Sequence, residues 1–182
     1  MGGGGSAASL PVAAGAGIVN DVSGGLADPQ MFAVVAELGA DYVLMHWRAH
    51  SATMQQADRL HYDDVVADVR RFLVERATVA RRAGVEEVWI DPGIGFGKTT
   101  EHNLRLLSRV ETFHALGCPV LVGPSRKAFI GRVFGDGDGD RTASTLGVVL
   151  AMALAGVQIV RVHDVAAAKQ ALTLFEAVRT NM

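Results

Sequence analysis

Residues 91–99 have the sequence Asp-Pro-Gly-Ile-Gly-Phe-Gly-Lys-Thr and connect a short apolar run at 88–90 to a helical pattern that starts near Glu101. This order predicts a carboxylate, Asp91, at the end of a strand, followed by a glycine-rich loop and a helix. In parallel α/β proteins this is the position where ligands bind. Glycines let the backbone approach a ligand closely, and the start of a helix attracts anions. The stretch therefore predicts a ligand-binding loop at the edge of a parallel sheet.

The same alternation of strand, loop and helix continues along the rest of the chain. Strands are expected at 17–19, 41–45, 88–90, 120–122 and 158–162, and helices at 29–38, 62–83, 104–116, 141–155 and 166–178. The strands are short continuous apolar runs, which favours a parallel sheet buried on both faces. Five βα units fit an open doubly wound sheet or part of a (β/α)8 TIM barrel, and polar residues directly after strands are typical of the barrel. On the helix at 62–83, the predicted apolar face consists of Val65, Val69, Phe72 and Val79.

Composition excludes several classes of protein. The chain has 182 residues, 49% of them hydrophobic, and a net charge of −2, so no nucleic-acid-binding face is expected. No apolar run reaches the ~18 residues of a membrane span, and no signal peptide opens the chain, so we expect a cytoplasmic protein without a membrane partner. The single Cys118 rules out an intrachain disulfide and is expected to be a packed thiol. Residues 1–9 are predicted to be a flexible Gly/Ser leader to one domain at 10–182.

Other motif interpretations fail on their spacing. Three residues separate Gly93 from Gly97-Lys98-Thr99, whereas a nucleotide-binding P-loop requires four. The acidic stretch 136–140 resembles the start of a calcium loop but lacks its glycine and its final glutamate. No tight metal-binding spacing is formed by His46, His50 and His61. The metal ligands, if any, therefore stay unassigned.

Polar residues after the other strands allow two interpretations each. Asn20 and Asp21 fit either a binding site or a turn before two glycines. Residues 125–127, Ser-Arg-Lys, place two cations at the expected start of a helix, which opposes the helix dipole unless an anionic ligand binds there. Arg161 and His163 alternate along a strand and should point the same way, as suits a phosphate or pyrophosphate. The alternative is a surface ion pair between Arg161 and Asp164.

Five of these segments, taken together, resemble the dihydropteroate synthase family. The resemblance covers about residues 12–180, in order and spacing, and rests on the segments 20–25, 44–46, 91–98, 123–127 and 161–164. It implies a (β/α)8 barrel that condenses dihydropterin pyrophosphate with p-aminobenzoate in folate biosynthesis, and that is inhibited by sulfonamides. It also implies Mg²⁺ as a cofactor and the possibility of a homodimer.

The resemblance assigns roles to residues by position. Asn20 and Asp91 would hydrogen-bond the pterin ring, and Met45 and Phe96 would pack around the two substrates. Lys127 would contact the pterin and help to form the aminobenzoate pocket.

On the other side of the expected site, the resemblance makes Ser125 the partner of the aminobenzoate carboxylate. Arg161 and His163 would bind pyrophosphate, and Gly95 and Gly123 would line the substrates. The residues expected to carry the chemistry are Asp91, Lys127, Arg161 and His163.

The family pattern includes three βα units that would come before residue 12, with two loops that close over the substrates and an asparagine that helps to hold Mg²⁺ and pyrophosphate. Five units cannot close an eight-stranded barrel, so we expect open strand edges and little turnover by the 182-residue chain. Two alternatives stay open: a pterin-binding domain that transfers a methyl group from folate to a corrinoid protein, and a fragment that binds without catalysis.

Overall fold

The computed structural model describes residues 12, 15–48, 61–135 and 140–181. The predicted leader at 1–9, His50 and most of the acidic stretch at 136–140 lie outside the described residues. Within the described residues, no helix is long and apolar enough to cross a membrane.

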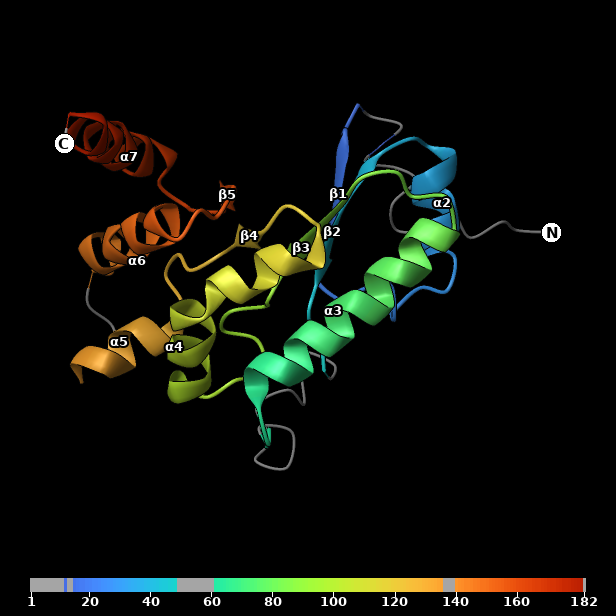
Figure 1. Ribbon diagram of the computed structural model, residues 1–182, viewed down its shortest axis with the longest axis horizontal. Helices are drawn as coiled ribbons and strands as arrows, with labels where there is room; N and C mark the ends of the chain where they lie inside the picture. The colour runs from blue at the N-terminus through green and yellow to red at the C-terminus, as the bar shows by residue number, and fades with distance from the viewer. Residues whose placement is uncertain (1–11, 13–14, 49–60, 136–139, 182) are drawn as a thin grey trace.

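The strands run parallel and follow one another in chain order. β1 (Ile18–Asp21), β2 (Asp41–Met45) and β3 (Val88–Asp91) form one sheet, and β4 (Leu121–Val122) pairs with β5 (Ile159–Val160). A parallel bridge between Ile90 and Val120 joins the two groups, so the order is β1-β2-β3-β4-β5 (Figure 1). A doubly wound sheet reverses its strand order at a switch point. The order without reversal is that of part of a barrel, as expected.

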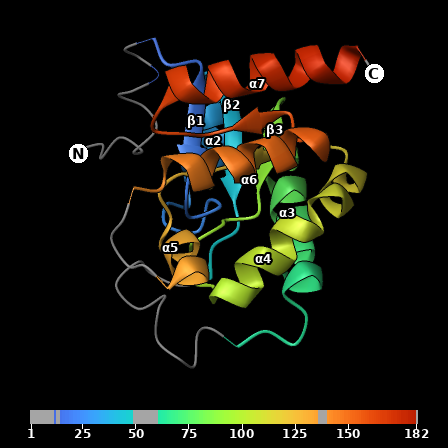
Figure 2. The same cartoon turned by 90° about the vertical axis from the view of Figure 1, so that its left-hand side faces the viewer.

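Helices cover the outer side of these strands. They are α2 (Met31–Glu37), α3 (Val65–Arg82), α4 (Thr100–Ser108), the 3-10 helix η2 (Val110–Leu116), α5 (Ala128–Phe134), α6 (Thr142–Leu154) and α7 (Val165–Thr180). Figure 2 shows α6 and α7 side by side, next to the short strand β5. The core lies between strands and helices and contains, among others, Val35, Tyr42, Leu44, Leu73, Ile90, Leu106, Phe113 and Val120.

Caps move several helix ends from their predicted positions. α3 begins at Val65, later than the predicted 62, because the Asp64 carboxylate accepts the N–H groups of the first turn. α4 begins at Thr100, close to the start near Glu101 and earlier than the bound of 104, because Thr99 and His102 form a reciprocal capping box. The predicted helix at 104–116 is interrupted at Arg109, after which the chain continues as η2. A helix was expected to start at 125–127 without a predicted range, and α5 begins just after this segment, at Ala128.

The buried face of α3 is only partly the predicted one. Val65 and Val69 are buried, but Val79 is 42% exposed. The stripe instead continues through Leu73, Ala77 and Ala80. A 3.6-residue period places these positions on the line of Val69, whereas Val79 lies at the edge of the face.

Alternation along the strands separates an outer from an inner face. Asp21 pairs in register with Leu44, which lies in the core, so it points outward, while Asn20 points inward. The Asp21 carboxylate accepts the N–H groups of Ser23 and Gly25, at 2.8 and 2.6 Å, and the hydroxyl of Tyr42. The turn interpretation is therefore correct for Asp21.

Cys118 is 7% exposed and its sulfur lies 3.0 Å from a guanidinium nitrogen of Arg81. Burial raises the pKa of this thiol. It is the packed thiol that the sequence predicted.

Candidate active site

Asp91 ends β3 on the inner face of the sheet. It is 7% exposed, and its Oδ1 accepts the N–H of Gly93 at 2.7 Å. Burial raises its pKa to about 6, while the Gly93 N–H and the charges of Lys98, Lys127 and Arg161 act in the opposite direction. Three cations from the ends of β3, β4 and β5 thus converge on one buried carboxyl group.

Lys127 lies in the loop after β4, near enough for its charge to act on this carboxyl group. Burial lowers its pKa, and so does the charge of Arg161, whereas Asp91 raises it. Its ammonium group lies 3.8 Å from the centre of the Phe96 ring, a cation–π contact. Its side chain also lies against Gly95, where a Cβ atom would be 2.8 Å from Lys127 Cδ. The glycine thus leaves the space that the lysine occupies.

Of the two cations in the Ser-Arg-Lys segment, Lys127 alone turns toward Asp91. Arg126 is exposed and adopts a left-handed backbone, with φ 57°. α5 begins at Ala128 with Lys127 as its N-cap residue, so the two cations come just before the first turn and not within it.

The ends of β4 and β5 are tied together by side chains. The buried Ser125 Oγ lies 2.9 Å from His163 Nδ1 and accepts the His163 backbone N–H at 3.2 Å. Gly123 lies beside Arg161, and a Cβ atom there would be 3.6 Å from Arg161 Nε. The structure therefore brings these four predicted site residues together.

The alternative for Arg161, an ion pair with Asp164, is not found among the described residues. The Asp164 carboxylate instead caps α7 by accepting the Ala167 N–H at 2.9 Å. Arg161 and His163 are both exposed at the end of β5, and Asn20 is exposed at the end of β1. These three predicted ligand contacts lie open to water, whereas Met45, at 2% exposure, lies in the buried floor of the site.

Lys98 is a residue of the site that the sequence analysis did not select. It is 2% exposed and its Nζ donates to the carbonyls of Gly93 and Phe96, at 2.9 and 3.0 Å. It also lies 3.0 Å from Nδ1 of His46, which follows β2. A lysine within a glycine-rich loop was a signal of an unusual environment. Its partner His46 could not be found from the sequence, because it lies 52 residues away in the chain.

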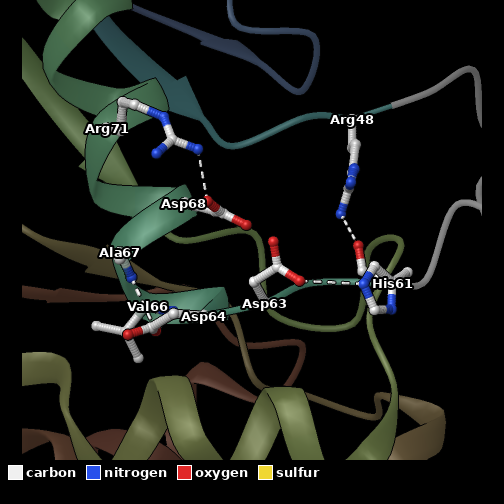
Figure 3. A network of polar contacts seen from close by, with 8 residues as sticks. All are labelled: Arg48, His61, Asp63, Asp64, Val66, Ala67, Asp68 and Arg71. Atoms are coloured by element: carbon white, nitrogen blue, oxygen red, sulfur yellow. Dashed lines mark hydrogen bonds and ion pairs between the residues drawn. The ribbon is translucent and has the colours of Figure 1, made fainter.

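A second group of contacts holds the same loop from α3. Tyr62, just before the helix, donates its hydroxyl to Gly97 O at 3.1 Å. The Arg48 guanidinium lies 4.2 Å from the centre of the Tyr62 ring and donates to the carbonyl of His61. Figure 3 shows Arg48 reaching across to His61, which lies next to the carboxylate of Asp63, while Asp64 caps the start of the helix.

Gly93 tests how tightly this loop is built. It has φ 69°, and an added Cβ atom would lie 2.5 Å from the His46 backbone oxygen. Gly93→Ala is expected to lower the free energy of unfolding by about 3 kcal/mol, from left-handed backbone strain and overpacking together. Gly117→Ala is the matched control, because Gly117 has φ 66° and no atom within 4 Å of the added Cβ. Urea unfolding of both should show a loss of only about 1 kcal/mol for the control; equal losses would mean that His46 makes room.

The described residues do not fit a magnesium site of their own. Mg²⁺ prefers several oxygen ligands, and no group of three or more His, Cys, Asp or Glu side chains among the described residues could hold a metal ion. Asp91 is a strand-end carboxylate that faces inward, and the charges of three cations already act on it.

Comparison with known proteins gives the family. The model of the pterin binding enzyme family matches residues 6–163. Dihydropteroate synthase of Mycobacterium leprae is 46% identical over 90% of this chain, and that of Escherichia coli is 39% identical over 90%. The chain spans 60% and 57% of the length of these two relatives.

Solved structures of dihydropteroate synthases have the same fold. The enzyme of Thermus thermophilus in complex with 6HMPPP has a TM-score of 0.85 at 45% identity, covering 91% of this chain and 65% of the other. Its complex with 4-aminobenzoate has a TM-score of 0.87 at 44% identity, covering 92% and 68%. A sulfonamide drug complex of the Yersinia pestis enzyme has a TM-score of 0.86 at 33% identity, covering 93% and 61%. With its parallel strands and polar strand ends, the chain belongs to the pterin binding enzyme family.

Proposed function

We propose that this chain carries the substrate site of a dihydropteroate synthase, a transferase that joins dihydropterin pyrophosphate to p-aminobenzoate in folate biosynthesis. The observation that supports this best is the convergence of Lys98, Lys127 and Arg161 on the buried Asp91. A carboxylate suits the paired N–H donors of a pterin ring, and cations suit a pyrophosphate. Relatives have been solved with 6HMPPP and with 4-aminobenzoate.

The pterin would bind at the inner ends of β1, β2 and β3. Asp91 Oδ1 is held by the Gly93 N–H, and Oδ2 has no hydrogen bond among the described residues, so it is the oxygen we assign to the ring. Asn20 would donate and accept from the opposite edge. Met45 would form an apolar floor, and Phe96 a wall shared with the second substrate.

The reaction breaks the bond between the pterin methylene carbon and the pyrophosphate oxygen, and it forms a bond from that carbon to the aminobenzoate nitrogen. Arg161 and His163, on one side of the β5 end, would stabilise the charge that gathers on the departing pyrophosphate. Lys127, 3.8 Å above Phe96, would hold the pterin beside the amine. The nitrogen gives up one proton to the surrounding water as the new bond forms.

The aminobenzoate would lie between Phe96 and the loop after β4. We assign its carboxylate to Ser125, whose hydroxyl is already oriented by His163, and we assign Gly95 and Gly123 to the walls of the pocket. Held by its carboxylate, the amine is positioned for attack. Sulfonamides, which resemble p-aminobenzoate in shape, would compete for this place, as the Yersinia pestis complex suggests.

Four earlier predictions stay proposals. The resemblance gave a requirement for Mg²⁺ and a homodimer, and the composition gave a cytoplasmic location and one domain at 10–182 after a leader at 1–9. Because the described residues supply no magnesium site, we route no step through the metal.

Arg161→Ala tests the assignment of the leaving group. The substitution is expected to weaken binding of dihydropterin pyrophosphate by up to ~1 kcal/mol more than binding of the pterin alcohol, as for removal of one partner of an exposed charged pair. Titration calorimetry with both ligands measures the difference. Arg132→Ala, at the exposed end of α5, removes a cation outside the site and should change neither affinity. Equal losses for the two ligands in Arg161→Ala would mean that this arginine does not meet pyrophosphate.

A further inference from the structure

Lys98 is a buried cation whose donors are all used inside the protein. Its ammonium group has three N–H bonds, and three acceptors surround it: Gly93 O at 2.9 Å, Phe96 O at 3.0 Å and His46 Nδ1 at 3.0 Å. Burial lowers the pKa of His46 well below its usual range, with the charge of Lys98 adding to the effect. The imidazole is therefore neutral and can accept from the lysine.

The charge on Lys98 is linked to the charge on Asp91. Burial lowers the pKa of Lys98 to about 7, the Asp91 carboxylate opposes this, and Arg48 and Lys127 add to it. An ammonium group is costly to bury without an opposite charge. Here the cost is offset by the Asp91 carboxylate and by the loop carbonyls that accept from Lys98.

We propose that Lys98 is a positioning residue of the pterin pocket: it fixes the Gly93–Gly97 loop so that Phe96 lies against Lys127. Through its bond to Gly93 O, at 2.9 Å, it also places a positive charge beside the Asp91 carboxylate, which the Gly93 N–H holds at 2.7 Å. This inference rests on the proposed function. Lys98 touches no ligand in this scheme, because its three donors are already bonded within the chain.

Two uncharged side chains also form hydrogen bonds with the same loop, and they serve as comparisons for Lys98. Tyr62 donates to Gly97 O at 3.1 Å, and the Asn103 side chain accepts the Gly95 N–H at 2.6 Å. Removing the Tyr62 hydroxyl loosens the loop but leaves the electrostatics of Asp91 intact. Removing the Lys98 ammonium group does both.

The test follows the Asp91 carboxyl carbon by NMR in the 182-residue chain labelled with ¹³C-aspartate, and Asp91→Asn identifies the signal. The protein is titrated without ligand. Lys127 and Arg161, the other two cations that act on Asp91, are then the same in each variant. The wild-type midpoint should lie near the pKa of about 6. A cation removed from a carboxylate raises the carboxyl pKa, so Lys98→Met and Lys98→Gln should both raise the midpoint by about one unit or more. Tyr62→Phe should keep the wild-type value.

An unchanged midpoint in the Lys98 variants, or an equal rise in Tyr62→Phe, would overturn the proposal. Unfolding of a variant would lower the Asp91 midpoint instead of raising it, because an unfolded aspartate titrates near pH ~3.9. Lys98→Gln keeps two donors for the two carbonyls, and if both Lys98 variants unfold, the lysine serves the fold and the proposal is wrong. Pterin alcohol affinity at neutral pH should also fall by about tenfold in Lys98→Met. A wild-type chain that binds no pterin contradicts the proposed function, whereas the carboxyl titration still decides the role of Lys98.

Discussion

Turnover of dihydropterin pyrophosphate and p-aminobenzoate by the 182-residue chain alone is expected to be at least ~10³-fold slower than by the Thermus thermophilus synthase. Asn20, Arg161 and His163 are exposed to water, so the charges that should stabilise the departing pyrophosphate act in a high dielectric. Loss of one such donor in a closed site costs about 10²–10³ in rate, and poorer positioning of the amine adds to it.

The same openness has a second consequence. β1 pairs with β2 and β5 pairs with β4, so in the described sheet both outermost strands have a free edge. Free edges promote association, and apolar side chains such as Ile18, Val165 and Leu174 are exposed beside these strands or on α7. Light scattering should therefore show species larger than one chain. Rapid turnover by a monomer would contradict both expectations and would mean that the five strands hold a complete site.

Lys127→Met is expected to abolish measurable binding of both substrates, with a loss of about 3 kcal/mol or more for the pterin ligand. The lysine is partly buried, lies on the Phe96 ring and shares a field with Asp91 and Arg161. Its removal takes away a ligand contact and also one of the cations that oppose protonation of Asp91. Methionine keeps the length of the side chain, so the pocket should not collapse.

The control for this substitution is Lys169→Met, on the exposed side of α7. It removes a lysine from the surface and should leave both affinities unchanged. Calorimetric titration with dihydropterin pyrophosphate, and separately with p-aminobenzoate, measures the two variants. Wild-type affinity in Lys127→Met would contradict the assignment of Lys127 as a contact of either substrate.

The sequence predicted most of the architecture because the strands are short apolar runs between glycine-rich turns. β2 was predicted at its observed bounds, 41–45, and Asp91 was predicted at the end of a strand, where β3 places it. Helix ends were less predictable, because they depend on side chains such as Asp64 and Thr99 that could equally have served a loop. α5, with seven residues, is too short for periodicity to identify.

The proposed site was predictable for residues assigned to the ligand and unpredictable for a residue that supports a neighbour. Lys127 and Arg161 follow strands, and the family resemblance points to them directly. Lys98 could not be assigned, because its function depends on His46 and on the carbonyls of a loop whose shape the sequence does not reveal. Asp21 shows the converse: a polar residue at a strand end that faces outward and closes a turn.

Titration of the 182-residue chain with dihydropterin pyrophosphate in a calorimeter is the most direct measurement of whether these five strands form a pterin site. We expect one ligand per chain, with heat that disappears in Asp91→Asn, because the paired donors of the ring then lose their carboxylate. Absence of binding by the wild-type chain, or wild-type affinity in Asp91→Asn, would contradict the assignment of the pterin to the end of β3.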